Sequence, residues 1–267
     1  MASVDNSYYY NGNRYVPRTE NDNTQGFILA SIASSAIMGT LPIFGKPFEK
    51  QLQKETAFNH EYKDAFLRSI KESGLDSKGV NIVQAQNLRS VANDFISGRN
   101  ACYVPATKQI ILNTDKISIA GFHEVGHAMN HLTGKFGKVL QKLRAPGYAL
   151  AGLMGTVALF TRPKPKDAPK TAGDFVKDNC GKIAFLGWLP TVIEEAMASY
   201  KGVKLARKSG VAEPLIKNMK KLYAKAFLTY AGRATATGLA VGAASMIMDK
   251  YSRPKKVEED NGFYLFG

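Results

Sequence analysis

Two histidines and a glutamate form the string His-Glu-Val-Gly-His over residues 123–127. Residues four apart share one face of a helix, so the imidazoles of His123 and His127 can reach one metal ion while Glu124 lies beside them. A catalytic zinc ion is held by three protein ligands and keeps its fourth position for water. A neighbouring carboxylate can accept the proton of that water and deliver it to a leaving amine. The string therefore predicts a zinc hydrolase site with Glu124 as the general base.

The third zinc ligand decides the class of hydrolase. A metzincin would have Gly at position 130 and His at position 133, where this chain has Asn130 and Thr133, so that class is excluded. His131 lies one turn beyond His127. Three histidines at i, i+4 and i+8 on a straight helix span about 12 Å, which is too far to close on one ion. We therefore predict that His131 supports the site from outside or lies on the surface.

A second motif, Glu-Glu-Ala-Met-Ala-Ser-Tyr-Lys-Gly, occupies residues 194–202 in an apolar helical context. Together the two motifs resemble those of the gluzincins, and most closely the M48 family of membrane-associated metallopeptidases. That family combines H-E-x-x-H with a later E-x-x-A-D-x-x-G. Aligning on Ala198 and Gly202 makes Glu195 the third ligand, with Glu194 in reserve. The resemblance implies a zincin-like catalytic domain that binds one Zn²⁺ per chain and hydrolyses peptide bonds.

The chain departs from the family pattern at Ser199, where the family has Asp. In the family this Asp orients a ligating histidine, and such partners tune metal affinity by about 10–100-fold. Ser199 can accept a hydrogen bond without charge, and Asn130 or Glu194 are alternative acceptors. A second reading of Glu194 and Glu195, as solvated charges on a helix surface, stays open.

The residue that would stabilise the oxyanion is not fixed by the sequence. Gluzincins usually supply a downstream His, Tyr or Arg for this role, but no histidine follows His131. The available candidates are Tyr200, Arg207, Tyr223, Tyr230 and Arg233.

A β-hairpin is predicted over residues 101–113, immediately before the metal-binding helix. Two short apolar and β-branched runs flank a small turn, and Pro105 restricts its strand to an edge or an end. In gluzincins a strand ahead of the metal helix binds the substrate backbone as an added strand. By that resemblance the main chain of the second run would bind the substrate; the run comprises Gln109, Ile110, Ile111, Leu112 and Asn113.

Residues 26–45 contain no charge, and twenty helical residues span a bilayer core of roughly 30 Å. The polar, acid-containing segment before them is unlike a signal peptide, so we expect a transmembrane anchor rather than a buried helix. Shorter apolar stretches occupy 146–161, 183–193 and 234–248. The first two of these lie between the zinc motifs, where M48 membrane proteases also carry a hydrophobic hairpin.

These features predict a mainly α fold with a small β-hairpin or sheet, that is, an α+β protein with apolar, membrane-associated helices. Residues 1–25 are expected to be a disordered polar tail because they have low apolar content and no periodicity. The metallopeptidase domain would run over 46–249, including the apolar hairpin 146–193 and the apolar helix 234–248. Residues 250–267 would form a charged tail. A break in the helical pattern is expected near Gly210 and Pro214.

The chain of 267 residues has a formal net charge of +14. Lys and Arg flank apolar stretches without a nucleic-acid motif, so anionic lipid head groups explain the charge better than nucleic acid does. Eight Lys and Arg residues over 200–225 favour a cytoplasmic catalytic domain. Cys102 and Cys180 lack metal spacing and form no disulfide framework. The expected partners are a peptide or protein substrate and a bilayer.

Two alternatives to the membrane peptidase stay open. The first is a non-catalytic membrane scaffold with a degenerate zinc site, which Ser199 and the missing downstream histidine favour. The second is a soluble small gluzincin whose apolar helices fold over the site.

Overall fold

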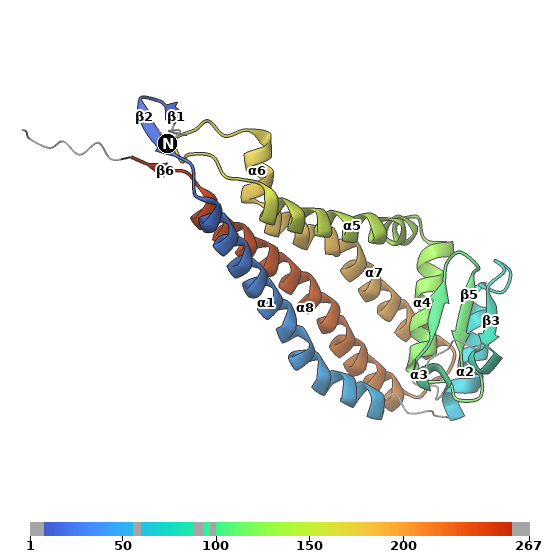
Figure 1. Cartoon of the computed structure of the whole chain (residues 1–267). Coiled ribbons are helices and arrows are strands. Elements are labelled where there is room, and N and C mark those ends of the chain that lie inside the picture. Colours follow the sequence, from blue (N-terminus) through green and yellow to red (C-terminus); the bar gives the residue numbers. More distant parts are fainter. Residues whose placement is uncertain (1–7, 56–59, 88–92, 97–99, 258–267) are drawn as a thin grey trace, which may run out of the picture. The chain divides into compact units, whose positions relative to one another are not determined.

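The computed structural model describes residues 8–55, 60–87, 93–96 and 100–257, and over 41–55 it describes the course of the backbone alone. The described chain is mainly α-helical, with two small three-stranded sheets (Figure 1), as the sequence predicted. It divides into two compact units. Unit 1 comprises Met1–Gly39, Leu150–Leu186 and Ala236–Gly267, and unit 2 comprises Thr40–Ala149 and Gly187–Thr235. Long helices continue from one unit into the other.

The sheet of unit 2 contains the predicted hairpin and one further strand. Strands β4 (Cys102–Val104) and β5 (Gln109–Leu112) pair antiparallel, which confirms the hairpin, and β5 also pairs in parallel with β3 (Asn81–Gln84). The order β3-β5-β4 makes β5 the central strand. Both edges of β5 are therefore already paired with neighbouring strands, and no edge remains for a substrate strand. The prediction that a substrate binds to Gln109, Ile110, Ile111, Leu112 and Asn113 is wrong for this reason. The Asn113 side chain instead accepts hydrogen bonds from the main chain at Asp115 and Lys116.

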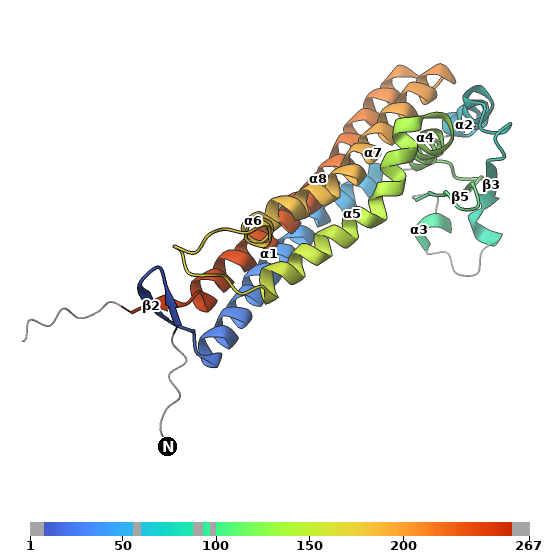
Figure 2. The ribbon, with the colours of Figure 1, turned by 90° about the horizontal axis from the view of Figure 1, so that it is seen from above.

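The core of unit 2 is formed by this sheet, helices α2 (His60–Ser73) and α4 (Ile119–Thr133), and buried residues from 203–223. Phe66 and Phe122 are fully buried and meet edge to face, with ring centroids 5.8 Å apart. Ser118 caps α4, because its hydroxyl accepts a hydrogen bond from the N–H of Ala120. Both views place α2 and α4 beside the sheet (Figures 1 and 2). Short helical segments, η1 (Ala85–Asn87) and α3 (Asn93–Ile96), follow β3.

Helix α4 crosses helix α7 (Cys180–Lys208) at very close range. A Cβ atom on Gly126 would lie 2.1 Å from the carbonyl oxygen of Ala198, and one on Gly202 would lie 2.6 Å from that of Phe122. Only glycine permits this approach. Ala198 and Gly202, on which the family motif was aligned, are therefore contact positions of the crossing.

The apolar stretches predicted from the sequence belong to longer helices. Residues 146–160 form the second half of α5 (Lys135–Phe160), 183–193 lie in α7, and 234–248 lie in α8 (Glu213–Ser252). Helices α7 and α8 are separated at Gly210, whose φ is +84°, as predicted. Among the described residues, α5 is the one helix long and apolar enough to cross a membrane. The predicted anchor 26–45 lies within α1 (Glu20–Glu55), but its part beyond residue 40 lies outside the described side chains.

Unit 1 contains the second sheet, which has the order β1-β2-β6. Strands β1 (Tyr8–Tyr10) and β2 (Asn13–Val16) form a hairpin, and β6 (Lys255–Lys256) pairs with β2. The prediction of a disordered tail over 1–25 is thus wrong for residues 8–25, because a neighbouring strand, distant in sequence, completes the sheet. Figures 1 and 2 show β2 and β6 at the end where α1 begins and α8 ends. Helix α6 (Ala172–Asp178) begins with a capping box between Thr171 and Asp174. Residues 1–7 and 258–267 of the two predicted tails lie outside the described residues.

Candidate metal centre

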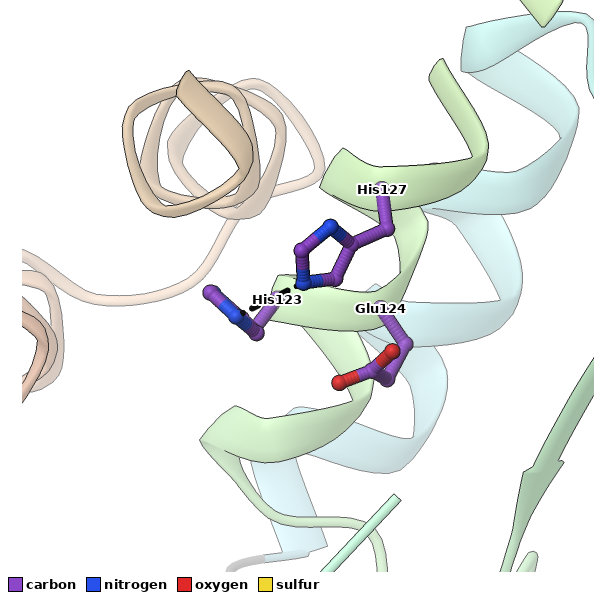
Figure 3. A group of neighbouring side chains, drawn as sticks. All are labelled: His123, Glu124 and His127. Carbon is purple, nitrogen blue, oxygen red and sulfur yellow. Dashed lines mark hydrogen bonds between the residues drawn. The ribbon is translucent and has the colours of Figure 1, made fainter. Parts of the chain in front are cut away.

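The side chains of His123, Glu124 and His127 project from neighbouring turns of α4 (Figure 3). The Nε2 atoms of His123 and His127 lie 3.0 Å apart, so the two imidazoles present the same ring nitrogen to a common point. His127 is buried and His123 is half-buried. The helix therefore brings together the three residues that the first motif predicted.

Helix α7 contributes two glutamates to this point. The Oε2 atom of Glu195 lies 3.1 Å from Nε2 of His123 and 3.5 Å from Nε2 of His127. Glu194 and Glu195 are 0% and 3% exposed, so the alternative of solvated surface charges is wrong for both. Burial of adjacent carboxylates is costly unless partners compensate it, and the partners here come from α4 and α5.

The separations of the three atoms suit a tetrahedral zinc site. Ligand atoms at roughly 2.0–2.1 Å from a tetrahedral ion are about 3.3 Å from one another. The three separations here are 3.0, 3.1 and 3.5 Å. Two His and one Glu are also the donor set of one class of catalytic zinc site. Two overlapping groups could hold a metal, one of His123, Glu124 and His127 and one of His127, Glu194 and Glu195.

The outer nitrogen of each imidazole is held by a separate partner. Nδ1 of His123 lies 3.2 Å from the Ser199 hydroxyl, and Nδ1 of His127 lies 2.8 Å from Oε1 of Glu194. Such contacts fix the orientation of a ring and direct its other nitrogen toward a metal. Ser199 thus contacts one of the two histidines, and Glu194 supplies a carboxylate to the other.

Three polar side chains surround Glu194. Asn130, which was predicted as an alternative acceptor, instead donates its Nδ2 hydrogens to Oε1 and to the carbonyl oxygen of Glu194. Gln141 donates to the same Oε1, at 2.9 Å. Arg144 bridges the pair of glutamates, with one nitrogen 3.0 Å from Oε2 of Glu194 and the other 3.0 Å from Oε1 of Glu195. The second oxygen of Glu195 is therefore occupied by Arg144, and Oε2 alone faces the histidines.

Sequence reasoning missed Gln141 and Arg144. They lie three residues apart on α5, so they share a face of that helix, but lysines surround them in the sequence. The sequence feature that could have identified them is a polar pair at i and i+3 just before an apolar stretch. This feature alone does not distinguish buried polar residues from their solvated neighbours.

The buried charges shift the pKa values of the cluster. Burial raises the pKa of Glu195, but hydrogen bonds from His123 and His127 outweigh burial and hold the pKa below its usual value. Burial lowers the pKa of His127, yet the charge of Glu124 and hydrogen bonds to Glu194 and Glu195 raise it to about 10. Without a metal, His127 therefore carries a proton shared with carboxylates. Metal ligation requires the neutral ring, so a metal and this proton compete.

Glu124 contacts the edge of the sheet. Its Oε2 accepts a hydrogen bond of 2.7 Å from the main-chain N–H of Tyr103 on β4. The Tyr103 hydroxyl in turn lies 2.8 Å from Nδ1 of His131. His131 therefore lies outside the cluster of His123, His127 and Glu195 and contacts the strand beside it.

The five candidates for oxyanion stabilisation lie in different surroundings. Tyr200 is 69% exposed, Arg207 pairs with Glu213 on the surface, and the buried Tyr223 donates its hydroxyl hydrogen to the carbonyl oxygen of Ile119. Arg233 is exposed and has a partner of its own. The Tyr223 ring lies 5.4 Å from that of His123, so Tyr223 and Tyr230 are both beside the cluster. Tyr230 differs in its contact with Glu195. Burial, then the charges of Glu195 and Glu124, raises its pKa, and it hydrogen-bonds with Glu195.

Comparisons with known proteins do not extend these observations. No family model matches the chain, and neither a curated protein nor a solved structure matches it. The geometry of the cluster on α4, α5 and α7 is therefore the basis for assigning a function.

Proposed function

We propose that this chain is a membrane-associated, zinc-dependent endopeptidase in which His123, His127 and Glu195 hold the metal. The observation that carries the proposal is the convergence of two Nε2 atoms and one Oε2 atom within 3.5 Å. Ser199 and Glu194 hold the outer ring nitrogens, which leaves the inner nitrogens available to a metal. The resemblance of the two motifs to those of the M48 family supports the same ligand set.

Bound zinc would lower the pKa of a ligated water and polarise the carbonyl of a peptide bond. Glu124 follows the first ligand and has a carboxylate oxygen within 4.8 Å of ring nitrogens of both histidines. Its role is to accept the proton of the attacking water and to return it to the leaving amine. Arg144 offsets the charge of the two buried glutamates and occupies Oε1 of Glu195, so Oε2 would be the oxygen available to a metal.

The substrate would add to the outer edge of β4 rather than to β5. All three residues of β4 are in register with β5, and on the outer edge the N–H of Tyr103 donates to Glu124, so a substrate strand would take the place of that hydrogen bond. A peptide paired with this edge would lie beside the general base. Main-chain pairing provides affinity that depends little on the substrate's side chains.

Tyr230 is the proposed donor to the oxyanion. Its hydrogen bond with Glu195 distinguishes it from the other four candidates. Tyr223 also lies near Glu124, but its hydroxyl hydrogen is donated to the carbonyl oxygen of Ile119. A hydroxyl donor aimed at developing negative charge contributes about 3–4 kcal/mol in comparable sites.

Membrane association is proposed from the exposed side of α5. Phe136, Val139, Leu143, Leu153 and Phe160 are exposed, and their spacing of three, four, ten and seven residues forms a stripe along the helix. Only 17% of the most apolar window of α5 is buried. Lysines and arginines over 200–225 favour a catalytic unit on the cytoplasmic side, and anionic head groups as its lipid partners.

Zinc content separates this proposal from its alternatives. The full chain, purified without chelator, should contain about one zinc per chain, as should the Glu213→Gln variant, which changes a surface carboxylate. Glu195→Gln should lose the metal. No zinc in the wild type, or equal zinc in the Glu195 variant, would reject the ligand set. The first result would leave a scaffold in which the His, Glu and Arg144 charges pair without a metal.

Activity then tests Glu124. Glu124→Gln should keep the zinc but cleave an unfolded protein such as casein about 10²–10⁴-fold more slowly. Undiminished cleavage by this variant would reject the general-base role. Carbonate extraction of cell membranes tests the association, because a soluble gluzincin would be released and a membrane-spanning chain would not.

A further inference from the structure

Unit 1 contains an open cavity of about 580 Å³ that the zinc site does not use. Its lining residues belong to the start of α1, the ends of α5 and α8 and the residues that follow α5. Figures 1 and 2 show these helix ends close together. Pockets for small molecules usually measure roughly 300–1,000 Å³. The volume is thus sufficient for a head group and the first part of an acyl chain.

One wall of the cavity is apolar. Phe27 and Phe160 stack with ring centroids 5.7 Å apart, and Leu159 and Met248 also line the wall. Phe160 is the last residue of α5, the helix whose length and composition suit a membrane. If α5 crosses a bilayer, its end lies at the level of the head groups, and so does this cavity.

Two buried polar atoms of the lining have no partner among the described residues. Ser252 is 5% exposed and its hydroxyl is unpaired, as is Oδ1 of Asn23. Buried polar groups are almost always hydrogen-bonded, so unpaired ones beside a cavity point to a ligand or water. The wall offers one donor and one acceptor to a polar molecule.

Charges of both signs occupy the rim. Arg162 lines the cavity and forms no ion pair with any residue that the structure describes. Arg18 donates to the carbonyl oxygens of Arg253 and Lys250, which holds its guanidinium at the end of α8, and its third nitrogen lies 4.0 Å from a carboxylate oxygen of Asp22. This distance is long for an ion pair, so Arg18 keeps positive charge to share with a ligand. Glu20 adds an exposed carboxylate. A simple anion would be repelled by Glu20, whereas a ligand with a phosphate and an amine would match both signs.

We infer that this cavity binds the head group of an aminophospholipid. The phosphate lies against Arg162 and Arg18, the amine lies near Glu20, and the start of an acyl chain covers Phe27 and Phe160. The inference rests on the membrane association in the proposed function, and it is independent of the zinc site.

The test titrates the full chain in detergent with palmitoyl-oleoyl phosphatidylethanolamine, using native mass spectrometry. Wild type should bind one lipid saturably, and Arg162→Gln should bind it about tenfold more weakly through loss of a charge-assisted contact. Lys166→Gln is the matched control, because Lys166 is an exposed cation of the same loop that does not line the cavity. Equal loss in both variants, or no saturable adduct, would overturn the inference.

Two further arms identify the source of the bound phosphate. Inorganic phosphate at the same concentration should give no adduct, and an adduct that competes with the lipid would instead indicate a site for a free anion. Glu20→Gln should weaken binding of phosphatidylethanolamine while leaving phosphatidylglycerol unchanged or tighter. An unchanged preference would overturn the assignment of the amine. Carbonate extraction of the same variants shows separately whether membrane association itself fails, since the titration in detergent does not depend on it.

Discussion

Glycine brings helices into close contact in both units, but different side chains fill the space around the contacts. In unit 2, Gly126 and Gly202 allow α4 and α7 to touch, and the crossing encloses the charged cluster of histidines and glutamates. In unit 1, Gly181 of α7 meets Gly238 of α8, where a Cβ on Gly181 would lie 2.7 Å from a carbonyl oxygen. There the neighbouring exposed side chains are apolar, such as Leu186 and Leu239.

This difference between the units shows that close helix packing alone does not identify a functional site. Small residues at helix contacts suit both a soluble core and a membrane. Buried charge is the distinguishing feature, because its cost must be met by partners and it is commonly retained for function. Unit 2 buries two adjacent carboxylates, whereas the described part of unit 1 exposes apolar surface and pairs the buried Lys177 with the half-buried Asp249.

The largest effect should come from closing the space at the α4–α7 crossing. In Gly126→Ala the new methyl group would overlap the backbone of Ala198, and backbone cannot move aside as a side chain can. We expect the free energy of unfolding to fall by about 3 kcal/mol and zinc to be lost with it. Thermal unfolding and metal analysis measure both. Gly152→Ala is the control, because nothing lies within 4 Å of its added Cβ and alanine favours a helix. Equal stability of the two variants would contradict the close contact.

Removing the cation that joins the two glutamates should have the next largest effect. Arg144→Met leaves Glu194 and Glu195 without the guanidinium that both contact, so we expect zinc affinity to fall by up to about 100-fold. Arg144→Lys should be intermediate, because an ammonium cannot bridge two carboxylates as a planar fork does. Competition with a chelating dye measures the affinity, and Arg207→Met is the surface control. Identical affinities for the Met, Lys and wild-type proteins would show that Arg144 does not position the ligands.

A smaller change is expected at the residue where the chain departs from the family motif. Ser199→Ala removes the only described contact to Nδ1 of His123, and we expect zinc affinity to fall about tenfold. Ser199→Asp should raise it, since a carboxylate increases the basicity of the ring. The same dye competition detects both changes. Tighter binding by the Ala variant would mean that the hydroxyl does not orient His123.

Local patterns predicted much of unit 2. The spacing of His123 and His127 placed both rings on one face of a helix, and the 101–113 hairpin followed from its two apolar runs and turn. The central place of β5 was not predictable, because its parallel pairing with β3 joins strands more than twenty residues apart in sequence. Arg144 was missed for a related reason. Its role depends on where α5 meets α7, and nothing in its local sequence distinguishes a buried partner from a solvated arginine.

Unit 1 was harder to predict than unit 2. Residues 8–16 have a polar composition typical of disorder, yet they form a hairpin because β6, near the other end of the chain, pairs with β2. Composition indicates how much apolar surface a segment can bury by itself. It does not indicate whether a strand distant in sequence will pair with that segment. The two tails were therefore predicted separately, although each is part of one sheet.

The smallest expected effect concerns that sheet and should leave the zinc site unchanged. The Tyr15 hydroxyl donates a hydrogen bond to the Asp167 carboxylate. This hydrogen bond is the main reason why the pKa of Asp167 lies below its usual value. A carboxyl with a lowered pKa stabilises the fold above its unfolded pKa, and this stabilisation is lost as pH falls through the folded value. Tyr15→Phe should therefore speed hydrogen exchange in β2 at pH 7 and make that exchange less sensitive to acid below about pH 4. Zinc content should match that of the wild type. A loss of zinc in this variant would mean that the hairpin and the metal cluster are coupled, and the contrast between the two units would no longer hold.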